Sequence, residues 1–456
     1  MKNRTVPVWL AGVLLLGLVS CAVEEPEGAS AVAPFAPPAS VPGLVPVAQG
    51  WAQTSINAVI FRKNALVTHQ DTQYVAFYSN DAALMLGKRR LGTTAWEIHQ
   101  TQYQGNVRDA HHAISIAVDG AGLLHVAWDH HVHPLRYSQG VRPGALELTD
   151  EMPMIGSQEE QVTYPEFYTL PNGDLLFLYR DGRSGSGNLM INRYEVATGT
   201  WRRVQEGLLD GQGQRNAYWQ MAVDPQGSVH LSWVWRETSD VATNHDLGYA
   251  KSTDGGLTWQ TSTGEPYATP ITAGNAEYAA RIPQNSELIN QTSMTTDASG
   301  RPYIATYWRP AGTDVPQFHL VYHDGRLWQT SQVSRRTTPF RLSGGGTRRI
   351  PVSRPQLMVA TSAGVTKAYL VFRDVERGER VSVAISDDLG EGSWRMVDLT
   401  DAPVGAWEPT YDTALWQREQ VLHLFHQVVD QPDGDDRGTF PETPLPRLIS
   451  VLEWKP

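Results

Sequence analysis

One short strand pattern recurs seven times along the chain, and its spacing restricts the fold more than any other feature. Each copy is a largely apolar run of five residues with an aromatic residue at or near its end, and the runs begin at residues 74, 125, 176, 230, 303, 369 and 422. Most copies follow a glycine turn and precede a partner strand, as Leu176–Arg180 precedes Leu189–Tyr194. A period near fifty residues, with about four strands per unit, is typical of propeller blades.

The repeat therefore predicts an all-β protein with the fold of a seven-bladed β-propeller. The segment Ser252–Trp259 reads S-x-D-x-G-x-T-W, an Asp-box that forms a turn between the outer strands of a blade, and Ser386–Trp394 is a looser copy. The alternative, two β-sandwiches, fits the even spacing less well. The two longest intervals between repeats carry insertions such as Arg335–Ile350, which we expect to line one face of the propeller.

The N-terminal segment predicts export. A basic start and the apolar run Val6–Val19 precede Leu18–Cys21, which resembles a bacterial lipobox. The apolar run is short for a helix that spans a membrane. We expect cleavage before Cys21, lipidation of that residue, and a protein anchored at the cell envelope. The alternatives are a plain secretory signal, which would give a secreted protein, and a short anchor.

Composition divides the chain and excludes some functions. Residues 1–21 form the predicted lipoprotein signal peptide, residues 22–50 are rich in Ala, Pro, Val and Ser and predict a flexible tether, and residues 51–456 form the propeller domain. The net charge of −11 gives no general basic field for nucleic acid. A single cysteine excludes an intramolecular disulfide framework. We expect the protein to be a monomer.

Histidines are concentrated in one predicted hairpin. Six of the 14 histidines lie between residues 111 and 133. His111 and His112 open the first strand, and the segment His130–His133 closes the second, so that His111 and His131 are expected to be neighbours. A zinc site is an alternative, because His131 and His133 share a face of a strand. His245, His319 and His323 could join such a metal site.

Other chemically capable residues lie at the ends of predicted inner strands, where a propeller brings blades together. Arg180 follows an apolar run and needs a partner if it is buried; the simplest partner is Asp181 or Glu166. The predicted substrate contacts combine imidazole, guanidinium, amide and aromatic groups, which suit sugar rings. These predicted contacts are His112, His131, Arg215, Asn216, Tyr218 and His245.

Several short motifs lie at the predicted strand ends and turns: Ile56–Arg62, Asp109–His111, Asp129–His131, Pro134–Tyr137, Tyr164–Pro165, Tyr179–Gly182, Arg215–Trp219 and the Asp-box. Together they resemble the motifs of the seven-bladed β-propeller ulvan lyases. The resemblance covers about residues 50–456. It implies cleavage of ulvan, a sulfated polymer of rhamnose 3-sulfate with glucuronic or iduronic acid.

The resemblance also implies catalytic roles. His111 and Tyr164 would act as base and acid, Arg180 would neutralise the uronate, and His131 would be a second histidine of the active site. The family often has Asn at the position of His112, which leaves open which of the adjacent histidines points inward. Because β-elimination removes a weakly acidic proton next to a carboxylate, it suits a neutral imidazole, a phenol and an arginine. The residues leave open whether His111 or Tyr164 removes the proton.

Two other functions fit the same residues. One is an α-L-rhamnosidase that hydrolyses rhamnosyl-glucuronate ends, and the other is a propeller that binds carbohydrate without cleaving it. A sialidase is disfavoured, because that family usually has six repeats and this chain has seven. The lyase chemistry requires no cofactor. The sequence leaves open whether a structural zinc or calcium ion is bound.

Overall fold

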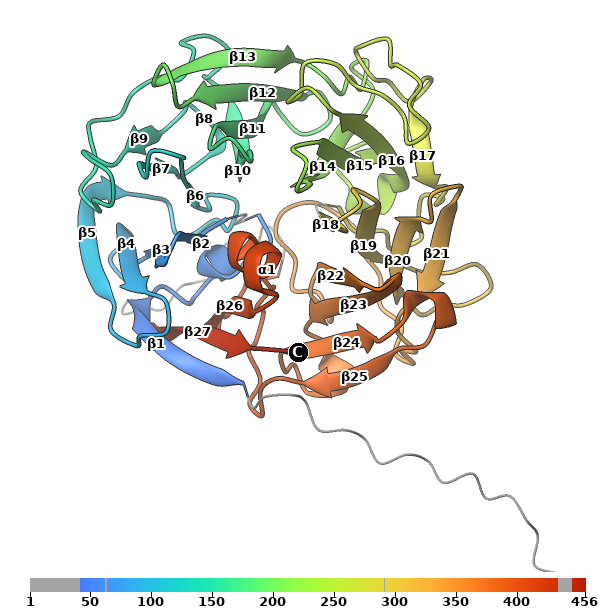
Figure 1. The fold of residues 1–456 in the computed structure, drawn as a ribbon. Coiled ribbons are helices and arrows are strands. Elements are labelled where there is room, and N and C mark those ends of the chain that lie inside the picture. Colours follow the sequence, from blue (N-terminus) through green and yellow to red (C-terminus); the bar gives the residue numbers. More distant parts are fainter. Residues whose placement is uncertain (1–41, 62–63, 291, 434–444) are drawn as a thin grey trace, which may run out of the picture. The chain divides into compact units, whose positions relative to one another are not determined.

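The computed structural model describes residues 42–61, 64–290, 292–433 and 445–456 of the chain. Seven antiparallel sheets are arranged around a central axis as the blades of a β-propeller (Figure 1). This confirms the predicted fold class and the predicted number of blades. The predicted signal peptide, Cys21 and residues 22–41 of the predicted tether lie outside the described residues.

The blades follow one another along the chain. The first comprises β2 (Leu66–His69), β3 (Thr72–Tyr78), β4 (Ala83–Arg90) and β5 (Glu97–Gln104), and the second comprises β6 (Ser115–Val118), β7 (Leu124–Ala127) and β9 (Tyr137–Gln139). The third comprises β10 (Val162–Thr169), β11 (Leu175–Asp181), β12 (Asn188–Glu195) and β13 (Thr200–Glu206), with β8 (His131–His133) paired to β10. The fourth comprises β14 (Asn216–Val223), β15 (Val229–Arg236), β16 (Asn244–Ser252) and β17 (Glu277–Ala280).

The last three blades complete the ring. The fifth comprises β18 (Ser293–Thr296), β19 (Pro302–Trp308), β20 (Gln317–His323) and β21 (Trp328–Gln332), and the sixth comprises β22 (Gln356–Ser362), β23 (Val365–Phe372), β24 (Ser382–Ser386) and β25 (Arg395–Asp398). The seventh comprises β26 (Leu422–Gln427), β27 (Arg447–Trp454) and β1 (Gly43–Gly50). The helical segments are α1 (Thr413–Glu419) and the 3₁₀ turns Ser55–Asn57, Val241–Thr243, Val375–Arg377 and Leu389–Glu391. Within the described ranges, every helix is too short or too polar to cross a membrane.

The seven repeated runs lie in β3, β7, β11, β15, β19, β23 and β26, as the sequence predicted. In the first six blades this is the second strand from the axis (Figure 1). Its residues are almost all buried, as in β11 and β15. Because neighbouring blades cover both faces of such a strand, it is apolar along its whole length and does not alternate with polar residues.

The ring is closed by pairing of the two ends of the propeller sequence. β1 runs antiparallel to β27, with Val45 opposite Val451, and forms the outermost strand of the seventh blade. The prediction that the tether extends to residue 50 was therefore wrong for Gly43–Gly50, which form a strand. The Ala, Pro and Val of this segment match the composition of the residues before it, so composition alone does not distinguish the strand from a tether.

Buried Asp–His pairs hold two of the inner hairpins. The Asp119 carboxylate accepts the backbone N–H groups of Ala121 and Leu123 and lies 3.2 Å from Nε2 of His125. Asp224 lies 3.1 Å from Nε2 of His230 in the same way two blades later. His125 therefore has a structural role in its blade, although it belongs to the histidine cluster in the sequence.

The Asp-box also has its predicted place, between β16 and β17. The Asp254 carboxylate accepts the N–H groups of Leu257 and Thr258, and Trp259 is buried below the turn, where its indole N–H donates to the Gly256 carbonyl. The looser copy, Ser386–Trp394, lies between β24 and β25. Both turns connect the two outer strands of their blades, so they lie away from the propeller axis.

The closure of the ring predicts a clear effect of truncation. A protein that begins at residue 51 lacks β1, so that the edge of β27 is left without its partner strand. We expect its melting temperature to fall by about 5 °C or more, and we expect it to associate through the exposed edge. Calorimetry and size-exclusion chromatography against a protein that begins at Pro42 would test this. Equal melting temperatures would show that the pairing is dispensable.

Candidate active site

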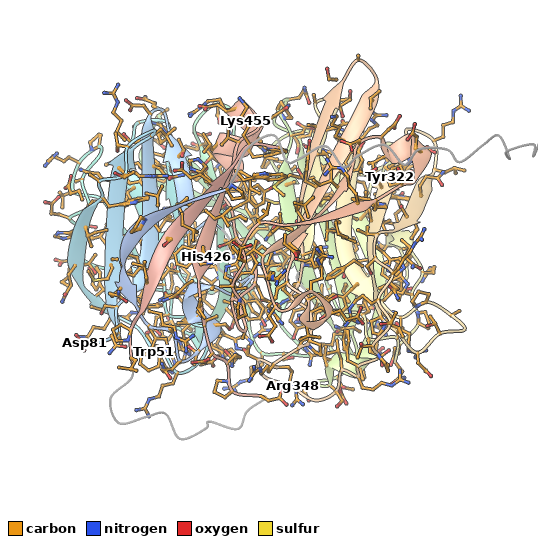
Figure 2. All side chains as sticks on the ribbon, turned by 90° about the horizontal axis from the view of Figure 1, so that it is seen from below. Trp51, Asp81, Tyr322, Arg348, His426 and Lys455 are labelled. Atoms are coloured by element: carbon orange, nitrogen blue, oxygen red, sulfur yellow. The ribbon has the colours of Figure 1, made fainter. Side chains whose placement is uncertain are left out.

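A pocket lies at one end of the propeller axis. In the side view of Figure 2, Arg348, which lines this pocket, lies toward the same end as Trp51 and Asp81, and Lys455 and Tyr322 lie toward the other. Five of the nine predicted site residues line it: His111, His131, Tyr164, Arg180 and Tyr218. The insertion Arg335–Ile350 was predicted to line one face of the propeller, and this is confirmed. Its residues that line the same pocket are Leu342, Gly345, Gly346, Thr347, Arg348 and Ile350.

Two stacked histidines share one carboxylate at the wall of the pocket. The rings of His111 and His131 are 4.2 Å apart and nearly parallel. Nδ1 of His111 lies 2.7 Å from one oxygen of Asp109, and Nδ1 of His131 lies 2.6 Å from the other. Phe61 stacks on the opposite face of His111, at 4.9 Å. The His111 ring is therefore held from both sides and along its edge.

Burial lowers the pKa of His111 to about 4, against the opposing effect of its hydrogen bond to Asp109. The imidazole is thus neutral near pH 7 and can accept a proton. Burial alone would raise the pKa of Asp109, but the hydrogen bonds from His111 and His131 outweigh it and hold that pKa well below its usual range. The carboxylate is therefore ionised near neutral pH.

The histidines converge for a different reason from the one predicted. The second-blade hairpin is shorter than expected, because β6 begins at Ser115 and β7 ends at Ala127. His111 and His112 precede β6, and His131–His133 form β8, which pairs with β10 of the next blade. The carboxylate of Asp109 and the pairing of β8, not the ends of one hairpin, bring the two rings together.

Tyr164 enters the pocket from an irregularity in β10. The register of β10 with β11 shifts between Thr163 and Glu166, and Tyr164 has a positive φ of 58°. For an aromatic residue that precedes proline, this conformation costs on the order of 1–3 kcal/mol, and such strain is common at functional sites. The bulge turns the Tyr164 ring out of the ladder, to 5.9 Å from the ring of His111.

The two tyrosines of the pocket differ in acidity. Burial, followed by the neighbouring Tyr218, raises the pKa of Tyr164, although three arginines oppose this. For Tyr218, burial alone would raise the pKa, but Arg236 and Arg180 outweigh it and lower the pKa. The rings lie 6.1 Å apart, so ionisation of one phenol disfavours ionisation of the other. Tyr164 is therefore the phenol that keeps its proton.

Two buried arginines of the pocket have no carboxylate partner among the described residues. The guanidinium of Arg180 donates to the Gly182 carbonyl and to the Thr163 hydroxyl, and its carbon lies 5.1 Å from the Tyr164 ring. Arg180 is only 2% exposed and forms an ion pair with neither Asp181 nor Glu166, the partners considered from the sequence. Arg236 donates to backbone carbonyls, and its Nε has no partner within the described chain. A buried cation without an anion favours an anionic ligand.

A third arginine of the pocket is already neutralised. Arg354 forms a two-pronged ion pair with Glu408, at 2.8 and 2.6 Å, and its guanidinium covers the Phe61 ring at 4.4 Å. Glu408 also accepts the backbone N–H of Ile60. Arg354 therefore supports the wall that holds Phe61 against His111.

The other four predicted contacts do not line the pocket. His112 lies outside the pocket lining, with its Nδ1 2.7 Å from Oδ1 of Asp129. Arg215 and His245 both contact Glu237, each at 2.7 Å, in a separate charged cluster. Their polar groups are thus engaged with neighbouring side chains. Asn216 is buried in β14, and its amide contributes to lowering the pKa of Tyr218.

The predicted site residues did not include Arg236, Asn290 and Arg354, which line the pocket, or Asp109, which contacts both histidines. One signal could have revealed Arg236: it ends the second strand of its blade, as Arg180 nearly ends the second strand of the preceding blade. Aligning the repeats blade by blade would have paired the two positions. Asp109 belongs to the motif Asp109–His111, but its contact with His131 depends on the fold and could not be read from the sequence.

One group of residues has the spacing of metal ligands in the part of the chain that the structure describes. It consists of Asp109, His111 and His131, whose nearest donor atoms lie within 4.8 Å of one another. The predicted alternative ligands are dispersed, since His245 contacts Glu237 and His319 stacks on Trp308 at 3.6 Å. The short contacts between Asp109 and both rings are those of hydrogen bonds.

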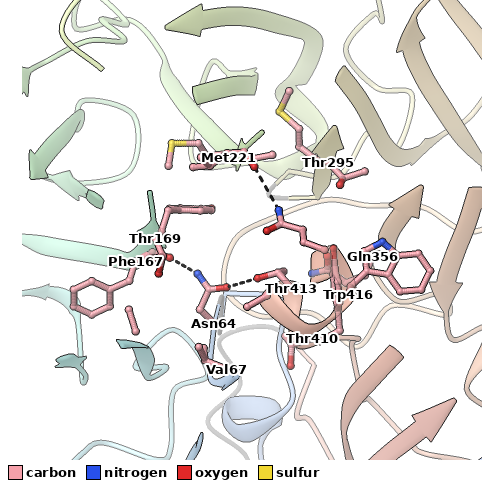
Figure 3. Close-up of a pocket in the computed structure, with 18 of the residues that line it drawn as sticks. Asn64, Val67, Phe167, Thr169, Met221, Thr295, Gln356, Thr410, Thr413 and Trp416 are labelled. Carbon is pink, nitrogen blue, oxygen red and sulfur yellow. Dashed lines mark hydrogen bonds between the residues drawn. The ribbon is translucent and has the colours of Figure 1, made fainter. Parts of the chain in front are cut away.

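A second pocket, of about 970 Å³, lies among the inner strands and α1. Figure 3 shows Asn64 between Phe167 of β10 and Thr413 of α1, and Asn64 makes a hydrogen bond to each. The described residues that line it include Met221 and Trp416 but no charged side chain. It has neither a general base nor a cation for an anionic substrate, so the pocket with His111 is the candidate active site.

Comparisons with known proteins agree with this architecture. The model of a family described as "BNR repeat-containing family member" matches residues 72–336. The curated protein "Ulvan lyase, long isoform" from Alteromonas sp is 23% identical over 328 residues, which cover 57% of this chain and 33% of that protein. The chain thus spans about a third of the length of this relative.

Solved structures share the fold. The polysaccharide lyase Uly1 superposes with a TM-score of 0.65 at 15% identity, over 91% of this chain and 99% of that chain. A PL25 ulvan lyase bound to -[GlcA(1-4)Rha3S]- superposes with a TM-score of 0.63 at 14% identity, over 84% and 94% of the two chains. These comparisons confirm the resemblance that the motifs indicated, and the structural matches at this identity show the fold alone.

Arg180 has no carboxylate partner among the described residues, whereas Arg354 has one. Replacing each of them should therefore have opposite effects on the free energy of unfolding. Arg180→Met removes a buried cation without a carboxylate partner, so we expect the free energy of unfolding to stay the same or to rise. Arg354→Met leaves Glu408 buried and unpaired, and we expect a loss of about 3–5 kcal/mol. Urea unfolding of both variants would measure this. A loss in Arg180→Met as large as in Arg354→Met would contradict this account of the pocket.

Proposed function

The chain belongs to the BNR repeat-containing family, and from the chemistry of its pocket we propose that it is a polysaccharide lyase that cleaves ulvan by β-elimination. The substrate would be a repeat of a uronic acid and sulfated rhamnose, and the product would carry an unsaturated uronate at its new non-reducing end. The names of the relatives and the sugar bound to one of the matching structures support this choice of substrate.

One observation carries the proposal. Arg180 is buried beside Tyr164 and His111 and has no carboxylate partner among the described residues, so the pocket provides the cation that a uronate needs. A uronate carboxylate beside this guanidinium would gain charge-assisted hydrogen bonds. The same contact would stabilise the negative charge that develops on the carboxylate when the neighbouring C5 proton is removed.

The pKa values favour one assignment of acid and base. His111 is neutral above about pH 4 and can take the C5 proton of the uronate. Tyr164 keeps its proton because burial raises its pKa, and it can protonate the oxygen that leaves C4. The rings of these two residues lie 5.9 Å apart, a separation that suits groups acting on adjacent carbons of one sugar.

Hydrolysis fits the pocket less well. Glycosidases typically use two carboxyl groups that flank the scissile bond. The described residues that line this pocket include neither Asp nor Glu, whereas they include three arginines besides Arg180. The α-L-rhamnosidase alternative therefore lacks its acid and base, and only the experiment below separates the lyase from a propeller that binds carbohydrate without cleaving it.

We also propose that the protein is exported and held at the cell envelope by a lipid on Cys21. The apolar run Val6–Val19 and the lipobox-like segment Leu18–Cys21 support this. An extracellular position is consistent with a polymeric substrate that is too large to enter a cell.

The proposed lyase predicts an ultraviolet signal from ulvan. Each cleavage creates a C4–C5 double bond conjugated with the carboxylate, so absorbance should rise with time. Tyr164→Phe and Arg180→Ala should each lower kcat by about 100- to 1,000-fold, because each removes a group that stabilises developing charge.

Tyr168→Phe is the matched control for Tyr164→Phe. Tyr168 lies on the same strand, and its hydroxyl donates to Glu166 outside the active-site pocket, so we expect activity close to that of the unchanged protein. Rhamnose released without a rise in absorbance would favour the hydrolase. Binding of ulvan without any shortening would favour a non-catalytic propeller.

The proposed base predicts the pH dependence of the reaction. Because the pKa of His111 is lowered to about 4, the imidazole becomes neutral as the pH rises through that value, and kcat/KM should rise with it. The raised pKa of Tyr164 keeps its phenol protonated, so ionisation of Tyr164 should cause no alkaline decline below pH 10. Initial rates between pH 4 and 10, with the fold checked by circular dichroism, would measure this. An acid limb near the ordinary histidine pKa would contradict the role of burial.

A further inference from the structure

Asp109 contacts two imidazoles at once but does not line the pocket itself. Its Oδ1 accepts the backbone N–H of His111 at 2.9 Å and also lies 2.7 Å from Nδ1 of the same residue. Its Oδ2 lies 2.6 Å from Nδ1 of His131. The two nitrogens that face Asp109 are thus the same ring atom of each histidine.

The contacts determine where the ring protons lie. An ionised carboxylate has only acceptor positions, so each Nδ1 within hydrogen-bond distance of it must carry a hydrogen. In a neutral imidazole, Nε2 then has the lone pair. Nε2 of His111 makes no hydrogen bond to any residue in the described ranges, so its lone pair is available to a ligand.

We propose that Asp109 is a positioning residue that holds His111 and His131 in their Nδ1–H tautomers, which leaves Nε2 of His111 as the proton acceptor of the reaction. The kinetic part of this inference rests on the proposed lyase function. The tautomers themselves can be measured on the protein without substrate.

The proton transfers balance with this assignment. Nε2 of His111 takes the C5 proton, the electron pair of that bond forms the C4–C5 double bond, and the C4–O bond breaks. The departing oxygen takes the proton of the Tyr164 hydroxyl. The imidazolium keeps its Nδ1–H bond to Asp109, whose negative charge stabilises it. Proton exchange between the imidazolium and the phenolate, directly or through solvent, then restores both groups.

A matched pair of substitutions separates the two histidines. In Asp109→Asn, the amide oxygen should occupy the Oδ1 position, because the backbone N–H of His111 requires an acceptor there. The amide NH₂ then faces Nδ1 of His131 and requires a lone pair on it. We expect only His131 to change to the Nε2–H tautomer. In Asp109→Ala both rings lose their partner, and both should show mixed tautomers.

The measurement is ¹⁵N NMR of protein labelled at histidine, with the signals assigned from His111→Gln and His131→Gln. The chemical shifts of Nδ1 and Nε2 report which nitrogen carries the hydrogen. Asp224→Asn is the control, because Asp224 contacts His230 in another blade and does not line the pocket. It should leave the spectra of His111 and His131 unchanged.

Kinetics on ulvan provide the second test. We expect kcat to fall by about 10-fold in Asp109→Asn and by on the order of 100- to 10,000-fold in Asp109→Ala. KM should change less, since Asp109 does not line the pocket. Asp224→Asn should keep its activity.

Two results would overturn the inference. One is an Nε2–H tautomer of His111 in the unchanged protein, and the other is a kcat within threefold of the unchanged protein in a folded Asp109→Ala. Failure of the lyase proposal would look different, because the unchanged protein would then not cleave ulvan while the tautomers still responded to the substitutions at Asp109.

Discussion

The antiparallel pairing of β1 with β27 is the contact on which the rest of the molecule depends. Each blade is a separate sheet, so the ring stays closed only if the last blade is held to the start of the propeller sequence, which the pairing of β1 with β27 does. Without this pairing the edge of β27 would be exposed and the first and last blades could separate. The candidate site needs this closure, because its side chains come from strands of the third and fourth blades and from the segments before β2, β6, β18 and β22. A small change in the angle between blades would separate groups that now lie within a few ångströms.

Positive charge in the pocket comes from a position that recurs at the ends of second strands. Arg180, Arg236, Arg309 and Arg373 lie at or next to the ends of second strands in four blades. Arg309 pairs with Glu287, and Arg373 donates to backbone carbonyls in the interior. Arg180 and Arg236 face the pocket without a carboxylate among the described residues. A chain with a net charge of −11 thus keeps a local site for an anion.

The architecture was readable from the sequence because strand repeats depend on local patterns. The seven apolar runs, their glycine turns and the Asp-box each involve residues close together in the chain, so spacing alone predicted the blades. The insertion at Arg335–Ile350 was predicted correctly for the same reason, since an interruption of a regular repeat must leave the blade. The error at Gly43–Gly50 came from a strand whose partner lies about four hundred residues away, which no local pattern reports.

The sequence by itself determined the blade repeat and the histidine cluster, and its resemblance to the ulvan lyases singled out His111, Tyr164 and Arg180. Only the tertiary structure decided which of these residues face the pocket and in which protonation state. That His112 points to Asp129 while His111 is held by Asp109 depends on distances between segments, not on their order. Burial and the presence or absence of a counter-charge set the pKa of each group, and both are properties of the packed ring.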